Sequence, residues 1–139
     1  MRTAESATRR YPVLSPEEIP AMNGHAGRNP VEVGIWTDPK AWDDFVSGAP
    51  DGTMAHRWAW LNIVSDTYGH KVVPLAAVRG RTLTGVLPLV EMRSRLFGHH
   101  LVSMPFLDTG GLCTAGDRAA DEALAAAATR LAEANGAHL

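Results

Sequence analysis

From residue 31 onward, the apolar and polar positions of the chain follow strand-like and helix-like periods in turn. Apolar residues alternate with others over residues 31–36, which predicts a strand with one buried face. Asp38 and Pro39 then mark a helix start, because Asp38 can cap the first backbone N–H groups and proline is tolerated at the first helical position. We expect this helix to end at Gly48 in a left-handed conformation.

The middle of the chain predicts a second helix and a β-hairpin. The helix is expected over residues 56–68 and is closed by Gly69. Two strands over residues 71–78 and 82–92 follow, joined by a tight turn, and a short strand over 101–104 comes next. Pro74 and Pro88 lie inside the hairpin strands. Because proline cannot donate to a ladder, each is expected at a sheet edge or a bulge.

The last predicted element is an alanine-rich amphipathic helix, capped by Asp117 and closed by Asn135-Gly136. The pattern therefore indicates an α+β fold, with a central, mostly antiparallel sheet, an antiparallel hairpin at its centre and flanking helices. Connections from helix to strand are usually short, so residues 137–139 are expected to begin another strand. On this interpretation the fold is incomplete at Leu139.

Composition divides the chain and limits its partners. Residues 1–30 carry four prolines and little apolar periodicity, so we interpret them as a flexible leader and residues 31–139 as one domain. The net charge of −2 lacks the basic footprint of a nucleic-acid binder. No apolar run is long enough for a secretory signal or a membrane span, which predicts a cytoplasmic protein. The single cysteine, Cys113, is interpreted as a small buried side chain rather than a nucleophile.

The histidine pair at 99–100 and the single histidine His56 are candidates for chemistry. His99 and His100 are neighbours on an extended segment and point to opposite faces, so they predict no metal site. His56, at the start of the second helix, has two interpretations. It could act as a general base toward an amine, or it could be a helix-start residue that is solvated or bonded to the backbone, which we favour.

Trp58 and Trp60 lie two positions apart on the second helix and so do not share a face. At most one of them is expected in the core, with the other meeting solvent or a second lobe. Packing is favoured over ligand stacking, although Trp60 stays a candidate binding residue.

The best candidate for a binding site is the segment from Ser103 to Gly111. A strand that ends at a proline and runs into a glycine pair allows backbone to approach a ligand closely. Asp108 could orient an ammonium group and Ser103 could donate a hydrogen bond to a carbonyl. A tight loop that needs glycine is the equally weighted alternative. The candidate residues of this segment are Ser103, Pro105, Phe106, Asp108, Gly110 and Gly111.

Three motifs, read in order, carry a family resemblance. They are AHRWAW with YGH at residues 55–60 and 68–70, TGVLPLV at 84–90, and LVSMPF at 101–106 followed by Gly110-Gly111. In this order the chain resembles the FemAB-like branch of the GNAT acyltransferases, and in particular the members associated with bacterial exosortase (PEP-CTERM) and exopolysaccharide systems. The resemblance covers residues 31–139.

The resemblance implies a two-lobed transferase, each lobe GNAT-like, that moves an acyl or aminoacyl group onto an amine. The donor would be acyl-CoA or aminoacyl-tRNA, and the acceptor an amine linked to peptidoglycan or polysaccharide. This chain would be the N-terminal lobe, inactive alone. It holds no cofactor loop of its own, because the string at residues 95–100 lacks the final glycine and leads into a strand rather than a helix. The alternative is a non-catalytic module that pairs with itself or with a partner lobe.

Overall fold

The computed structural model describes residues 13–14, 30–107 and 110–139, and over these residues the chain forms an α+β fold. Its five-stranded sheet has the order β1-β2-β3-β4-β5. Strand β1 is parallel to β2, and every other neighbouring pair is antiparallel. The strands are β1 (Val13–Leu14), β2 (Val31–Trp36), β3 (Lys71–Arg79), β4 (Thr82–Ser94) and β5 (Gly98–Val102). The predicted fold class and the central hairpin, β3–β4, are confirmed.

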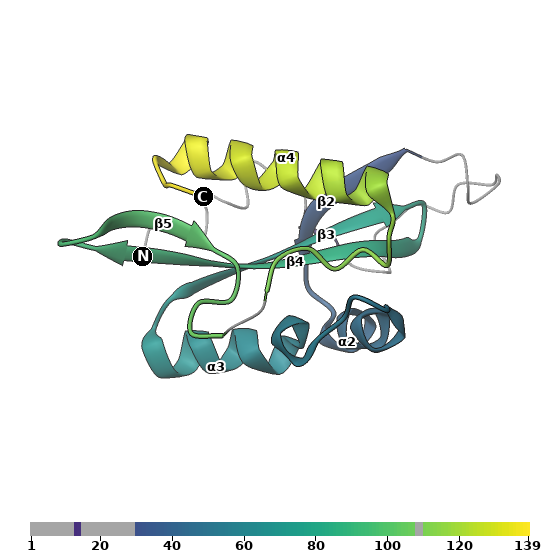
Figure 1. Ribbon diagram of the computed structural model, residues 1–139, viewed down its shortest axis with the longest axis horizontal. Coiled ribbons are helices and arrows are strands. Elements are labelled where there is room, and N and C mark those ends of the chain that lie inside the picture. The colour runs from purple at the N-terminus through teal and green to yellow at the C-terminus, as the bar shows by residue number, and fades with distance from the viewer. Residues whose placement is uncertain (1–12, 15–29, 108–109) are drawn as a thin grey trace.

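Helices cover both faces of the sheet (Figure 1). Helix α4 lies across one face, and α2 and α3 lie on the other. A short 3₁₀ turn, η1, joins α2 to α3. The helical elements are α2 (Pro39–Gly48), η1 (Met54–His56), α3 (Trp58–Tyr68) and α4 (Arg118–Asn135).

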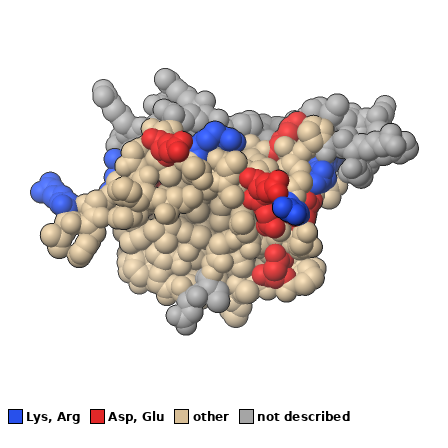
Figure 2. Space-filling model, turned by 45° about the horizontal axis from the view of Figure 1, so that its top comes forward, with Lys and Arg blue, Asp and Glu red and all other residues tan. Residues whose placement is uncertain are grey.

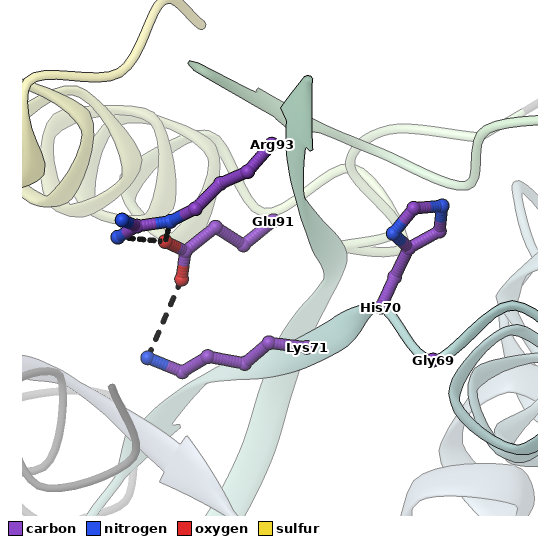
Figure 3. Close-up of a pocket in the computed structure, with 5 residues that line it drawn as sticks. All are labelled: Gly69, His70, Lys71, Glu91 and Arg93. Atoms are coloured by element: carbon purple, nitrogen blue, oxygen red, sulfur yellow. Dashed lines mark hydrogen bonds and ion pairs between the residues drawn. The ribbon is translucent and has the colours of Figure 1, made fainter. Parts of the chain in front are cut away.

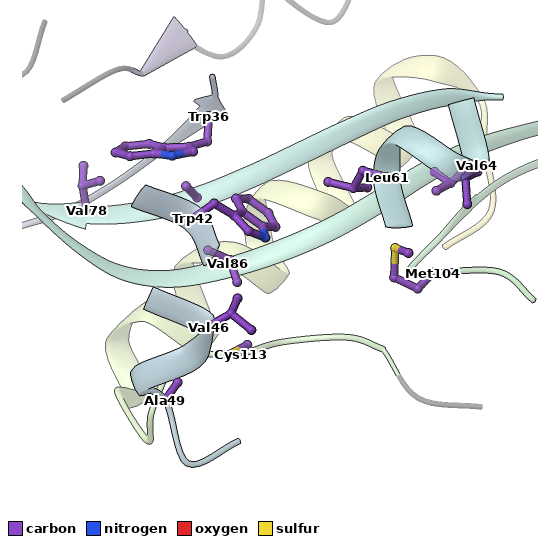
Figure 4. Packing of buried hydrophobic residues seen from close by; sticks show 12 residues of the cluster. Trp36, Trp42, Val46, Ala49, Leu61, Val64, Val78, Val86, Met104 and Cys113 are labelled. Atoms are coloured by element: carbon purple, nitrogen blue, oxygen red, sulfur yellow. The ribbon is translucent and has the colours of Figure 1, made fainter. Parts of the chain in front are cut away.

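Side chains of β3 and β4 alternate between the two faces of the sheet and so divide the core into two clusters. Val78, Val86 and Val90 face α2 and α3, where Trp42 is fully buried (Figure 4). Leucines of the same strands, such as Leu89, face the alanine stripe of α4. Because side chains of a strand alternate between faces, nearly continuous apolar runs are needed here to bury both sides of β3 and β4.

Most of the predicted helix ends are confirmed. Asp38 accepts hydrogen bonds from the backbone N–H groups of Lys40 and Ala41, and Asp117 accepts one from Ala120. Gly69 closes α3 with φ of 67°. The prediction for Gly48 is wrong: it is the last helical residue, and the chain leaves α2 through an extended residue instead of a left-handed one.

Two other boundaries differ from the sequence prediction. The expected helix over residues 56–68 is split at Arg57, which has extended backbone between η1 and α3. The expected strand over 101–104 lies instead at Gly98–Val102, and Met104 has a positive φ of 48° that a strand does not allow. Contacts distant in sequence lie at both boundaries: the backbone N–H of Trp58 donates to the Asp43 carboxylate (2.8 Å), and the Ser103 hydroxyl donates to the carbonyl of Pro88 (2.8 Å).

The two strand prolines lie opposite each other in the central β3–β4 pair. The pairing of β2 with β3 ends at Leu75, and the pairing of β5 with β4 starts only at Val90. Pro74 therefore lies beyond the end of the pairing with β2, and Pro88 lies before the start of the pairing with β5. The missing N–H of each proline thus breaks no hydrogen bond to these strands. The register shift in this strand pair is elsewhere, between residues 77 and 78.

The segment after α4 returns to the sheet beside β5. His138 forms a parallel bridge with His100. Its N–H donates to the carbonyl of His99 (2.9 Å), and its carbonyl accepts from the N–H of Leu101 (2.7 Å). This is the strand-like pairing expected of residues 137–139. Of the predicted leader, Val13–Leu14 forms β1 and Pro30 precedes β2, while its remaining residues lie outside the described part of the chain. Within the described residues, no helix has the length and apolarity to cross a membrane.

Candidate functional site

The loop that follows β5 is fastened to β4 by Ser103. The Ser103 hydroxyl donates to the carbonyl of Pro88 (2.8 Å) and accepts from the N–H of Gly111 (2.7 Å). Its only proton is therefore already used on a backbone carbonyl. A substrate carbonyl could take this hydrogen bond only by displacing Pro88, so the visible role of Ser103 is to hold the two ends of the loop together.

The two glycines of this loop match the alternative prediction, a tight loop that needs glycine. A Cβ atom on Gly110 would lie 2.9 Å from the carbonyl oxygen of Ser103, too close for any other residue without a shift of backbone. Gly111 has φ of 90°, which side chains rarely adopt. Pro105 is half-buried in the turn. Asp108, the predicted ammonium ligand, lies outside the described residues.

Phe106 points its ring out of this loop and onto the end of α3. Its φ is 75°, a strained value for a bulky residue, and its side chain is 60% exposed. The ring stacks on Tyr68 at 4.6 Å between centroids and lies 6.3 Å from the ring of His70. We call Tyr68, His70 and Phe106 the aromatic stack. The sequence predicted Phe106 as a site residue, whereas Tyr68 and His70 were named only as part of the motif at residues 68–70 and not as site residues.

His56 is buried rather than solvated, and its ring is bonded to the backbone. Nδ1 accepts from the N–H of Thr53 at 3.1 Å. A backbone N–H can only donate, so Nδ1 carries no proton and the neutral ring holds its proton on Nε2. Nε2 is buried without a well-aligned hydrogen-bond partner, although the backbone of Gly111 is close. Burial lowers the pKa of His56, and Gly111 and the charge of Asp51 offset this only in part.

This geometry leaves His56 without a basic nitrogen facing a substrate. The general-base interpretation would need the Thr53 contact to break, whereas the favoured interpretation, bonding to backbone, matches the observed contact. The proximity of His56 to Gly111 and of Gly111 to Ser103 brings three of the predicted residues together. These contacts hold the loop in place and leave no open site between the three residues.

The tryptophans of α3 both contribute to packing. Trp58 and Trp60 are both half-buried and pack against the cluster under α2 and α3, and neither is among its fully buried residues. Trp58 makes an edge-to-face contact with Trp42, whose indole N–H donates to the carbonyl of His56 at 2.6 Å. The bend at Arg57 between η1 and α3 allows these rings to reach the same cluster.

Asp51 was not singled out by the sequence, yet it anchors the segment before α4. Its carboxylate accepts from the N–H groups of Thr114 (2.9 Å) and Ala115 (3.0 Å). Burial would raise the pKa of Asp51, but these hydrogen bonds outweigh it and lower the value. The nearby thiol of Cys113 is fully buried, and burial together with the Asp51 charge raises its pKa to about 12. The expectation that Cys113 is a packing residue rather than a thiolate nucleophile agrees with this.

An apolar groove of about 330 Å³ lies between α4 and the outer part of the sheet. Leu89 and Leu101 form its sheet side, and Ala125 and Ala128 form its helix side. Its remaining lining residues are Leu87, Val102, Ser103, Leu112 and Leu139. Ser103 is the one polar side chain among them. The small alanines of α4 leave this space open, and because they also fit an ordinary helix–sheet contact, the sequence alone does not indicate a groove.

Neither a basic patch on the face shown in Figure 2 nor a group of metal ligands among the described side chains marks a site. On the face shown in Figure 2, Lys and Arg side chains are scattered and form no continuous basic patch. Within the described part of the chain, no three His, Cys, Asp or Glu side chains are grouped so as to hold a metal ion. Comparison with known protein families, with curated proteins and with solved structures finds no match for this chain.

Proposed function

We propose that this chain is the N-terminal lobe of a FemAB-like acyl or aminoacyl transferase and that it binds the acyl part of the donor. The observation that carries the proposal is the groove between α4 and β5, which is lined almost entirely by aliphatic side chains. Burial of each methylene of an acyl chain there would contribute roughly 0.8 kcal/mol. The sequence resemblance and the mostly antiparallel sheet with helices on both faces support the same assignment.

The reaction that the resemblance implies is formation of an amide from an acyl donor and an amine, with the donor's thiol or tRNA hydroxyl as leaving group. The amine must lose a proton in this reaction. His56 holds its unprotonated nitrogen against Thr53 and offers only an N–H on the other side. We therefore assign binding to this lobe and expect the purified chain to bind acyl donors without transferring the acyl group. The transfer step, in cell-envelope or exopolysaccharide metabolism, would need the second lobe.

Acyl-CoA thioesters of increasing chain length provide the test. We expect calorimetric affinity of the purified chain to rise from acetyl- to butyryl- to octanoyl-CoA, by up to roughly fourfold per methylene buried. Free CoA measures binding that does not use the groove. Ala125→Phe, which fills the groove from an exposed helix position, should remove the dependence on chain length.

Ala126→Phe is the matched control, because Ala126 is exposed on the same helix but does not line the groove. It should leave the affinities unchanged. Equal affinity for the short and long thioesters in the unmodified chain would contradict the proposal, as would equal losses in the two phenylalanine variants.

A second candidate function is a non-catalytic module that pairs with itself or with a partner lobe. The hairpin between β4 and β5 favours it, because Leu96 and Phe97 at its tip are 81% and 75% exposed. Exposed apolar side chains at one place are typical of protein–protein contacts. Light scattering after size exclusion, over a range of concentrations, tests this candidate.

A further inference from the structure

The aromatic stack of Tyr68, His70 and Phe106 joins two parts of the chain that are far apart in sequence. Tyr68 is the last residue of α3, and His70 directly precedes β3. Phe106 comes from the loop that follows β5. The stack therefore lies where the end of a helix meets a loop, and neither the groove beside α4 nor His56 includes any of its rings.

The ring of His70 faces away from the polar side chains near it. Glu91 pairs there with Nζ of Lys71 (3.4 Å) and with Nη2 of Arg93 (2.7 Å). Figure 3 shows these three side chains on one side and the ring of His70 on the other. His70 therefore contributes its ring to the aromatic stack and not to the ion pairs of Glu91.

The three rings are nearly parallel, and neither partner ring covers the far face of Phe106. The planes of Tyr68 and His70 differ by 11°, and the plane of Phe106 differs from them by 23° and 17°. His70 lies 6.3 Å from both other ring centroids, whereas Tyr68 and Phe106 are 4.6 Å apart. If Phe106 lay between its partners, the distance from Tyr68 to His70 would approach the sum of the other two. His70 therefore lies beside the pair, and a further ring can stack on the far face of Phe106.

The loop holds Phe106 outward in a strained conformation. Met104 and Phe106 have φ of 48° and 75°, values that bulky residues rarely adopt. Met104 is buried, whereas Phe106 is 60% exposed. The hydroxyl of Ser103 bonds to the backbone of Pro88 and Gly111 and so fixes the loop on both sides of Phe106. Strained backbone that holds an exposed side chain in place is typical of ligand-binding sites.

Contacts among the three rings do not by themselves account for this arrangement. Tyr68 is 53% exposed, so more than half of both Tyr68 and Phe106 stays open to water. A flat π system can cover the open face of Phe106 in the offset geometry that aromatic pairs prefer. A nucleobase has such a face, and stacking on aromatic side chains is a common means of binding bases.

We propose that the open face of Phe106 binds a purine base by stacking, with Tyr68 and His70 as the residues that hold the Phe106 ring in position. The choice of adenine as the base rests on the proposed function, because acyl-CoA and aminoacyl-tRNA both carry an adenine. The stack shares no residue with the lining of the apolar groove. Binding of the base and binding of the acyl chain can therefore be measured separately.

Titration of the purified chain with adenosine 5′-monophosphate (AMP), followed by ¹H NMR of the aromatic side chains and of the base, tests this inference. We expect saturable upfield shifts of the Phe106 ring protons, since a stacked base shields them. Ribose 5-phosphate, which lacks the base, gives the baseline and should not produce these shifts. Phe106→Gly removes the ring and suits the positive φ, so it should fold and should weaken AMP binding roughly fivefold or more.

Phe97→Gly is the matched control, because Phe97 is a 75% exposed phenylalanine of the β4–β5 hairpin and is not part of the stack. It should leave AMP binding unchanged, and Phe106→Tyr, which keeps a ring, should bind AMP within about twofold of the unmodified chain. The inference is overturned if AMP gives no saturable shift, or if ribose 5-phosphate or N-acetylglucosamine gives the same shifts as AMP. It is also overturned if Phe106→Gly, shown to be folded by its spectrum, binds AMP as the unmodified chain does.

The AMP titration and the acyl-CoA series fail independently. Loss of the dependence on acyl chain length with AMP binding intact would reject the acyl groove and keep the base site. A normal chain-length dependence without AMP binding would reject the base site alone.

Discussion

At the scale of single residues, His56 couples the loop of Ser103–Gly111 to the turn before α3. The ring is held neutral, because burial lowers the pKa of His56 while Nδ1 accepts from Thr53. In the unfolded chain a histidine titrates near pH 6.5. Below that pH the unfolded state binds a proton that the folded state does not bind until the pH has fallen further. The free energy of unfolding must therefore decrease as the pH falls below about 6.5.

Urea unfolding between pH 5 and pH 7.5 measures this dependence. The loss attributable to His56 should not exceed about 1.4 kcal/mol per pH unit, the slope for one proton. His56→Asn should be less stable at pH 7.5, and the difference from the unmodified chain should shrink toward pH 5. His138→Asn, at an exposed position, serves as the control and should keep the full pH dependence. An unchanged slope in His56→Asn would exclude His56 as its source.

At the scale of elements, the packing of α4 on the sheet depends on Gly85 in β4. A Cβ atom there would lie 2.9 Å from Cγ2 of Thr114, 3.0 Å from Cδ1 of Leu124 and 3.3 Å from Cβ of Ala120. Gly85→Ala should therefore push the helix away from the strand and cost about 1–3 kcal/mol of unfolding free energy. This range is large enough to measure by urea denaturation.

Gly48→Ala is the matched control for that substitution. Gly48 is the last residue of α2, and nothing lies within 4 Å of the added Cβ atom. Alanine restricts the unfolded chain without a clash in the folded one, so this variant should be more stable by about 0.4–1 kcal/mol. Equal effects of the two alanines would show that α4 has room to accommodate a side chain at Gly85.

The same elements show how much can be predicted from the sequence. The caps at Asp38 and Asp117 and the closure at Gly69 were predictable, because a cap depends on groups within four residues of one another. The stack of Phe106 on Tyr68 was not predictable, nor were the hydrogen bonds that the segment before α4 donates to the Asp51 carboxylate. They join parts of the chain that are distant in sequence, and an exposed ring or carboxylate has no period that reveals its partner.

The candidate site was predicted less well than the fold, for a related reason. The glycines at 110–111 and the loop around Ser103 were located correctly, since backbone demands are local. Whether the Ser103 hydroxyl is open to a substrate depends on the carbonyl of Pro88, which is brought there by strand pairing. The ion pairs of Glu91 were missed because charged residues at strand ends ordinarily face solvent: Glu91 and Arg93 share a strand face, but only the β3–β4 register places Lys71 opposite Glu91.

At the scale of the whole molecule, the fold leaves apolar surface at two places on the outer part of the sheet. One is the groove beside α4, and the other is the tip of the β4–β5 hairpin, where Leu96 and Phe97 are exposed. Strand β5 is the last strand of the sheet order, and its outer edge pairs with His138 at residues 99–101. Strand edges and exposed apolar side chains both promote association.

The interaction module therefore predicts that the isolated chain self-associates through the exposed apolar side chains at the hairpin tip. Light scattering after size exclusion should show a mass that rises from monomer toward dimer as the concentration increases. Phe97→Lys should shift this equilibrium toward monomer, whereas Met54→Lys, at a 74% exposed position in η1 away from the hairpin, should not. A single monomeric mass at every concentration would remove the support that the hairpin tip gives to the interaction module. The proposed acyl binding would then be tested only by the dependence of affinity on acyl chain length, because that measurement does not require association.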